Sequence, residues 1–264
     1  MRILIALALL GSALAVPKSP SRIVGGAPTT IEAYPYMSVM QYSATGFWWS
    51  HRCGGSLITS TAVLSAAHCF YGDQVSRWRS YLGSSQAHSG GSVHTLSRII
   101  MHPQYHDPTL NNDVAIVRLS NPAVFSNRIQ VARIAGPNYN VADGVAVTHV
   151  GWGQLWYGGP TSEQLMHVHV NVINQELCAE RYAYLKTLPG YQNWPDITNG
   201  MICAGILNAG GKDACGGDSG GPLAQNGDII VGVTSWGFEC ADSFYPGVSA
   251  RVSYFSNWIQ ANAS

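Results

Sequence analysis

The segment DACGGDSGGP, residues 213–222, is the most informative stretch of the sequence. It places Ser219 among glycines, which let another backbone approach the serine closely. No regular helix or strand requires GDSGGP, six specified residues in a row. Because a serine hydroxyl is a poor nucleophile by itself, a catalytic serine needs a histidine base and an acid that orients the histidine. Ser219 is therefore the candidate nucleophile.

Two upstream residues can supply the missing groups. His68 lies in AAHC, and Asp113 lies in NNDVAIVRL, where it opens a hydrophobic run typical of a buried strand. Taken alone, His68 is more typical of a packed histidine and Asp113 of a turn. Their order along the chain, His, Asp and then Ser, matches one of three known orders of the same triad. The combination predicts a catalytic triad of His68, Asp113 and Ser219.

These motifs resemble those of the trypsin-like serine endopeptidases of the chymotrypsin fold, and the chain is similar to the digestive trypsins of insects, moths among them. The resemblance covers residues 23–264. It is carried by seven motifs in family order: IVGG (23–26), CGGSLI (53–58), AAHC (66–69), DVAIVRL (113–119), GWG (151–153), GDSGGP (217–222) and SWG (235–237). It implies an all-β fold of two six-stranded antiparallel barrels, about 23–128 and 129–264, with the active site in the cleft between them.

The sequence pattern supports this fold class. Short apolar or alternating runs recur between Gly, Asn and Pro turns, which is typical of many short strands: residues 56–67, 93–100, 114–119, 144–152, 166–173 and 229–236. In residues 167–172 polar residues alternate with valines, which predicts one buried and one wet face; a metal pair of His167 and His169 is the less favoured alternative. Residues 253–263 have apolar residues near helical spacing and predict a C-terminal helix, capped by Ser253.

Six cysteines in a secreted chain suggest three disulfides, but the sequence by itself leaves 15 pairings open. The resemblance implies Cys53–Cys69, Cys178–Cys203 and Cys215–Cys240. Zinc is the rival use of cysteine, but the chain has no Cys-x-x-Cys spacing. A calcium site is not expected, because the loop after His68 offers only Asp73 among acids before Asp107. We expect no metal and no cofactor.

The resemblance also assigns roles around Ser219. The backbone NH groups of Gly217 and Ser219 form the oxyanion hole, which stabilises the charge of the tetrahedral intermediate. Ser235, Trp236 and Gly237 pair with the extended substrate by strand addition.

Specificity is expected to depend on Asp213, six residues before Ser219, where trypsins place the acid at the base of the primary pocket. Gly237 and Gly247 match its small walls. Ala214 stands where some relatives have a serine that helps to solvate lysine, so arginine is expected to be preferred over lysine. Glu239, Ser249 and the long stretch between Cys178 and Cys203 depart from the usual trypsin pattern.

The N-terminus predicts a secreted precursor. Arg2, an apolar run over residues 3–10 and the small-residue site at 13–15 are typical of a signal peptide over 1–15. A membrane anchor is the alternative, but the run is shorter than the roughly 20 residues that a span needs. Residues 16–22 are then an activation propeptide. Cleavage at Arg22–Ile23 frees an amine that, by resemblance, pairs with Asp218, and Arg22 fits the enzyme's own expected specificity.

Composition fits a compact secreted enzyme, with 46% hydrophobic and 11% charged residues in 264. The full chain has no net charge; residues 1–22 carry three of the 14 basic residues and no acid, so the mature part is at −3. This excludes a basic nucleic-acid surface. Lysine is scarce, which suggests an alkaline medium such as an insect gut, although compositional drift explains it equally well.

The expected partners are polypeptide substrates and protein protease inhibitors, with no nucleic acid or membrane and a monomeric state. Three alternative functions fit the sequence less well. A catalytically silent relative usually lacks a triad member, a cascade protease carries an additional N-terminal module, and a chymotrypsin-like or elastase-like specificity conflicts with Asp213. The sequon at Asn262 lies at the extreme C-terminus and is not expected to be glycosylated.

Overall fold

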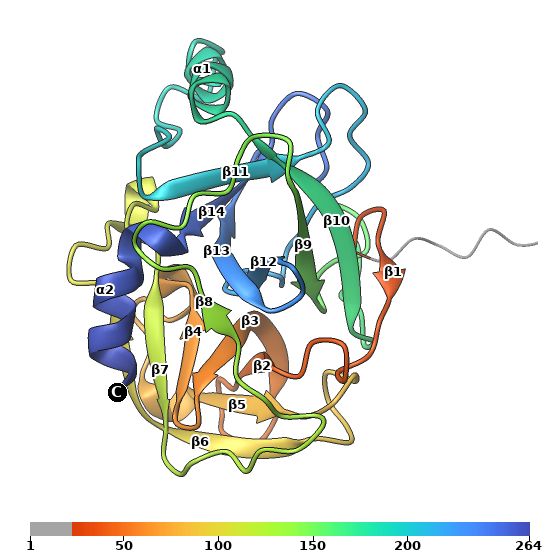
Figure 1. The fold of residues 1–264 in the computed structure, drawn as a ribbon, viewed down its shortest axis with the longest axis vertical. Coiled ribbons are helices and arrows are strands. Elements are labelled where there is room, and N and C mark those ends of the chain that lie inside the picture. Colours follow the sequence, from red (N-terminus) through yellow and green to blue (C-terminus); the bar gives the residue numbers. More distant parts are fainter. Residues whose placement is uncertain (1–22) are drawn as a thin grey trace, which may run out of the picture.

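The structure is a computed structural model and describes residues 23–264. The predicted signal peptide (1–15), the propeptide (16–22) and the Arg22 side of the cleavage site lie outside the described residues and stay predictions. The described chain folds into two β-barrels with a helix along one side (Figure 1).

The first barrel holds six antiparallel strands in the closed order β2-β3-β4-β7-β6-β5. It is coloured orange to yellow in Figure 1. Its strands are β2 (Met37–Tyr42), β3 (Ser50–Thr59), β4 (Ala62–Ser65), β5 (Trp78–Leu82), β6 (Ser92–Met101) and β7 (Ala115–Leu119). Buried apolar side chains from all of these strands except β6 join one core that continues into the second barrel.

The second barrel has the strand order β9-β10-β11-β14-β13-β12, and the β12–β9 pairing closes it. Its strands are β9 (Ala146–Gly151), β10 (Met166–Ile173), β11 (Met201–Gly205), β12 (Pro222–Gln225), β13 (Ile229–Trp236) and β14 (Gly247–Arg251). Two short strands attach outside the ring: β1 (Ala27–Pro28) to β10, and β8 (Arg133–Ile134) parallel to β13. The predicted pair of six-stranded barrels is confirmed.

Strand β10 has the alternating burial that its sequence predicts for a strand in a barrel wall. Its burial alternates along the strand, with the valines inside. His167 Nδ1 is hydrogen-bonded to the hydroxyl of Tyr34, and His169 Nδ1 is hydrogen-bonded to the hydroxyl of Thr148. One ring nitrogen of each histidine is therefore already occupied by a neighbouring side chain. This agrees with the prediction that the polar residues of this strand form its solvent-facing side.

Two α-helices are formed, and neither is long and apolar enough to cross a membrane in the part of the chain described. The C-terminal helix α2 (Val252–Ala263) is confirmed, but the predicted Ser253 cap is wrong: β14 runs directly into the helix, whose N-cap is Arg251 without a side-chain cap bond. Helix α1 (Gln175–Lys186) was not predicted. Asn174 caps it by accepting a hydrogen bond from the Leu177 amide. Residues 23–264 also contain three 3-10 helices: η1 (Ala67–Cys69), η2 (Val75–Arg77) and η3 (Asp107–Thr109).

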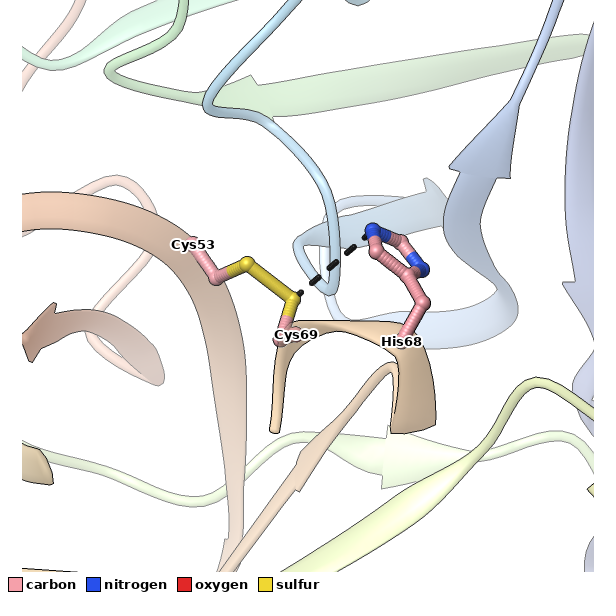
Figure 2. Close-up of side chains that lie close together, drawn as sticks. All are labelled: Cys53, His68 and Cys69. Carbon is pink, nitrogen blue, oxygen red and sulfur yellow. Dashed lines mark hydrogen bonds between the residues drawn. A yellow bond between two sulfur atoms is a disulfide. The ribbon is translucent and has the colours of Figure 1, made fainter. Parts of the chain in front are cut away.

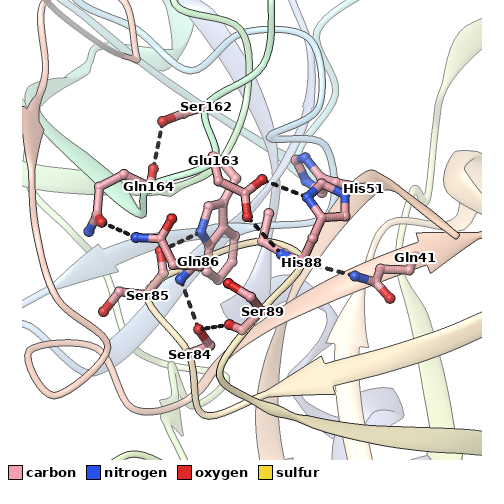
Figure 3. A network of polar contacts seen from close by, with 12 residues as sticks. Gln41, His51, Ser84, Ser85, Gln86, His88, Ser89, Ser162, Glu163 and Gln164 are labelled. Atoms are coloured by element: carbon pink, nitrogen blue, oxygen red, sulfur yellow. Dashed lines mark hydrogen bonds and ion pairs between the residues drawn. The ribbon is translucent and has the colours of Figure 1, made fainter.

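The two barrels are joined by a polar network between the loop after β5 and the loop before β10 (Figure 3). Gln86 Nε2 donates to Gln164 Oε1 at 2.5 Å, and His88 Nδ1 lies 2.6 Å from Glu163 Oε2. The amide of Ala87 adds a backbone bond to the carbonyl of Glu163. Helix α2 packs on strands of both barrels. These contacts hold the barrels in one relative position, which a site shared between them requires.

Candidate active site

The first barrel presents His68 and Asp113 in direct contact. His68 lies on η1, just after β4, and Asp113 lies just before β7, which is hydrogen-bonded to β4. His68 Nδ1 is 2.6 Å from Asp113 Oδ2, and the His68 amide donates to Asp113 Oδ1 at 2.8 Å. Both carboxylate oxygens are therefore held by the same histidine, which fixes the ring orientation.

This contact sets the protonation of the imidazole. Burial by itself lowers the pKa of His68, but the charge of Asp113 and its hydrogen bond to the ring raise it, and the net pKa is raised. The contact with Asp113 therefore makes the imidazole more basic than an ordinary histidine.

A residue of the second barrel completes the contacts of Asp113. Ser235 Oγ, on β13, donates to Asp113 Oδ2 at 2.5 Å. The resemblance had assigned Ser235 only to the substrate edge, so this contact was missed, and no sequence signal marks it.

Ser219 lies in the loop between β11 and β12, at the junction of the barrels. Its carbonyl accepts a hydrogen bond from the Gly54 amide of β3 at 2.8 Å and lies 3.8 Å from Cys69 Sγ. The same sulfur is 3.9 Å from His68 Nε2 (Figure 2). Within residues 23–264 no hydrogen bond joins Ser219 Oγ to His68 Nε2. Ser219 and His68 thus both have an atom within 4 Å of the Cys69 sulfur. A hydrogen bond between a catalytic serine and its histidine is often long before substrate binds.

The three side chains in Figure 2 also form a cluster of metal-ligand types: Cys53, His68 and Cys69. The two sulfur atoms are bonded to each other, however, and are not free thiolates. We assign no metal to this cluster.

The backbone around Ser219 is shaped for an anion. Gly217 has φ +94°, a conformation that side chains disfavour. The amides of Gly217 and Ser219 donate to no acceptor within the described chain. The buried Asp218 carboxylate between them accepts from the amides of Gly153 and Cys215, which fixes the loop, and burial raises its pKa to about 7. Two free NH groups beside the serine thus form a candidate oxyanion hole.

A cavity of about 290 Å³ opens beside Ser219. Every residue predicted for substrate binding lines it: Asp213, Ala214, Ser235, Trp236, Gly237 and Gly247. Other lining residues belong to no motif that marks them in the sequence, among them His149, Gln154, Tyr157, Trp194 and Thr234. These come from distant segments that only the fold brings together.

Asp213 is a buried carboxylate in this cavity. It accepts hydrogen bonds from the amides of Ala214 at 2.8 Å and Ala241 at 3.2 Å. Burial raises its pKa to about 7, and the nearby charge of Asp218 adds to the shift. A Cβ on Gly247 would lie 2.7 Å from Asp213 Oδ1, so only glycine leaves the carboxylate open here.

The departures from the trypsin pattern either contribute to the cavity lining or, like Ser249, lie next to a residue that does. Glu239 lines it and has φ +55°, the left-handed region that a glycine would adopt freely. Ser249 is buried on β14, opposite Thr234. The long stretch after Cys178 supplies an aromatic cluster in which Trp194 packs near Tyr191 and Phe238.

The disulfides are Cys53–Cys69, Cys178–Cys203 and Cys215–Cys240, as the resemblance implied. The first ties β3 to η1 and its histidine. The third ties the segment before Ser219 to the chain after Trp236, on the rim of the cavity. Ile23, the first described residue, is fully buried.

The first barrel thus carries a histidine bound to a buried acid, and the second carries Ser219, two free amides and an acidic pocket. This is the set of groups expected of a serine endopeptidase. Comparison with known proteins agrees. Residues 23–259 match the family described as Trypsin. The chain is 49% identical to alkaline trypsin B of Manduca sexta and 47% identical to trypsin CFT-1 of Choristoneura fumiferana, over the whole length of both chains in each case. It is 40% identical to achelase-1 of Lonomia achelous, over 91% of this chain and all of the relative. The chain belongs to the trypsin family and is a trypsin-like serine endopeptidase, similar to lepidopteran trypsins.

Proposed function

We propose that the enzyme hydrolyses peptide bonds after basic residues through an acyl-enzyme on Ser219. His68 takes the proton of Ser219 Oγ and later delivers it to the departing amine, while Asp113 holds the tautomer and stabilises the imidazolium. The amides of Gly217 and Ser219 receive the oxyanion. The buried carboxylate of Asp213 carries the specificity proposal, because a buried charge without a cation needs one from the ligand.

Arginine is proposed as the preferred residue. A guanidinium presents several donors in a planar fork that fits both oxygens of Asp213, whereas an ammonium on a shorter side chain needs additional acceptors. Ala214 offers only a methyl group in the cavity lining, beside a backbone amide that is already bonded to Asp213.

Substrate is proposed to bind as an added strand along Ser235, Trp236 and Gly237, all of which line the cavity. The partners are polypeptide substrates and protein inhibitors that mimic them, and the enzyme acts as a monomer. The contact between His68 and Asp113 argues against a silent relative, since the base is already oriented.

The enzyme is further proposed to be secreted as a zymogen and activated by cleavage at Arg22–Ile23. Three disulfides fit an oxidising, extracellular compartment. Ile23 is fully buried, and the buried carboxylate of Asp218 suits a freed amine as partner. Digestion in an alkaline gut lumen fits the scarcity of lysine and the names of the relatives that are called alkaline trypsins.

One assay tests this function. The activated enzyme and a Ser219→Ala variant are compared on matched arginyl, lysyl and aromatic amide substrates between pH 6 and pH 10. We expect turnover of both basic substrates, faster for arginine, and none by the variant. Turnover of the aromatic substrate alone would remove Asp213 from specificity, and equal rates on arginine and lysine would remove the preference.

A further inference from the structure

His149 lies against the acidic base of the cavity, although no sequence motif contains it. It belongs to β9, where it pairs in register with Val168 of β10 and Leu223 of β12. Its Nε2 lies 3.9 Å from Asp213 Oδ1, and its Nδ1 lies 3.2 Å from Thr234 Oγ1. The two side chains are 4% and 8% exposed, so water screens this pair very little.

In the part of the chain described, the His149 nitrogen lacks a hydrogen-bond partner and the Asp213 carboxylate lacks a lysine or arginine. His149 Nε2 is buried and has no hydrogen-bond partner within residues 23–264. Among the described residues, two backbone amides donate to Asp213 and no lysine or arginine pairs with it. A buried polar atom without a partner is costly, and a buried carboxylate more so. One added proton between Oδ1 and Nε2 satisfies both atoms at once, and it leaves the pair electrically neutral whichever atom holds it.

The other charged and titratable groups nearby do not compete for this role. Asp218 is a like charge next to Asp213, the phenol of Tyr182 is bonded to the carbonyl of Pro246, and Glu239 lines the cavity. His149 is the one basic side chain among the described residues that line the cavity.

We propose that His149 and Asp213 form a proton-sharing pair, in which His149 is a positioning residue that confines cation recognition to neutral and alkaline pH. The proposal rests on the proposed function of Asp213. In the empty pocket at lower pH the pair holds one proton. When an arginine or lysine side chain binds, its cation takes over the neutralisation of Asp213, and the proton leaves to solvent. Proton and substrate cation therefore compete for one carboxylate.

The experiment uses benzamidine, a small amidinium that remains charged over the whole range and needs neither His68 nor Ser219. Its Kd is measured between pH 5 and pH 9 on the activated wild type, His149→Leu and His149→Gln. A matched control is His169→Gln, which changes a histidine on the outer face of the same barrel. Calorimetry in two buffers of different ionisation enthalpy counts the protons released on binding.

In the wild type we expect binding to weaken as pH falls, with proton release near the midpoint. In His149→Leu the protonated carboxyl loses its acceptor, so the acid limb moves about one pH unit lower, a roughly tenfold loss of proton affinity. His149→Gln restores part of the shift through its amide oxygen, and His169→Gln behaves as wild type. The acid limb of each protein is measured relative to its own affinity at pH 9, so a change in pocket shape does not enter the comparison.

Two results would overturn the proposal. An acid limb that does not move in His149→Leu would make His149 a packing residue only. A limb that moves to higher pH would mean that Nε2–H donates to the ionised carboxylate instead. Absence of benzamidine binding at pH 9 in the wild type is a different outcome, because it would contradict the proposed function of Asp213 itself.

Discussion

Ser235, in the second barrel, donates a hydrogen bond to Asp113, in the first, on the same oxygen that contacts His68 Nδ1. The orientation of the base therefore depends on both barrels. This explains how residues far apart in the sequence act at one place, and why the packing of the barrels matters for the chemistry.

Asp113→Asn tests the role of the buried acid. The amide keeps the size of the side chain but favours the wrong imidazole tautomer, so we expect kcat to fall by about 10⁴-fold, the loss known for this change in another serine protease. KM and the thermal unfolding midpoint should change little. Steady-state kinetics on an arginyl amide measure this, and a loss below tenfold would show that Asp113 does not orient His68.

The raised pKa of His68 predicts the acid limb of activity. The general base must be neutral, so kcat is lost as pH falls through the pKa of His68 in the enzyme–substrate complex. The midpoint of kcat should lie above the ordinary histidine value of about 6.5. Saturating substrate keeps the ionisations of the pocket out of the measurement. A midpoint at or below 6.5 would contradict the contact with Asp113.

Asp213 should cost stability when it is ionised. Its folded pKa of about 7 is above its ordinary value of 3.8, so the empty pocket destabilises the fold increasingly as pH rises from about 4 to 7. Asp213→Asn removes this cost, and we expect a gain of up to about 4 kcal/mol in unfolding free energy at pH 8. The gain should vanish near pH 4. Denaturant titrations at both pH values measure it, and a difference independent of pH would refute the assignment.

The disulfides offer a matched pair of tests, because Cys178–Cys203 and Cys215–Cys240 both have a sequence separation of 25. Replacing either pair by serines should cost about 3 kcal/mol of stability. The Cys215–Cys240 sulfurs belong to residues that line the cavity themselves, whereas Cys178–Cys203 lies outside the lining. Loss of Cys215–Cys240 should therefore raise KM for arginyl substrates by about tenfold more than loss of Cys178–Cys203. Equal effects of both replacements on KM would mean that the Cys215–Cys240 bond has no particular role in the pocket.

The precursor allows a test of self-activation. Purified alone, the Ser219→Ala precursor should remain uncleaved at Arg22–Ile23, while the wild-type precursor matures over time. N-terminal sequencing measures this. A variant that still matures by itself would contradict autoactivation and leave the enzyme's specificity untouched.

The period-two patterns predicted many short strands, and the local motifs predicted the triad candidates. The pair of barrels and the role of Asp213 followed from the resemblance that these motifs carry. The sequence did not predict α1, whose segment QELCAERYAYLK lacks an apolar stripe and which is held by the Asn174 cap and the Cys178 disulfide. It did not predict His149 either. In the segment VTHVG, residues 147–151, His149 occupies an ordinary strand position. Its proposed role follows only from its distance to Asp213, which the sequence does not show.

The central claim is that Ser219 attacks a substrate whose cation is held in an acidic pocket, and an active-site titration tests it most directly. A guanidinium-bearing aryl ester that acylates rapidly and deacylates slowly is mixed with the activated enzyme, with and without benzamidine. We predict a burst of one equivalent of phenol, an acyl group found by peptide mass spectrometry on Ser219, and suppression by benzamidine. No burst, or labelling that persists in Ser219→Ala, would contradict the account.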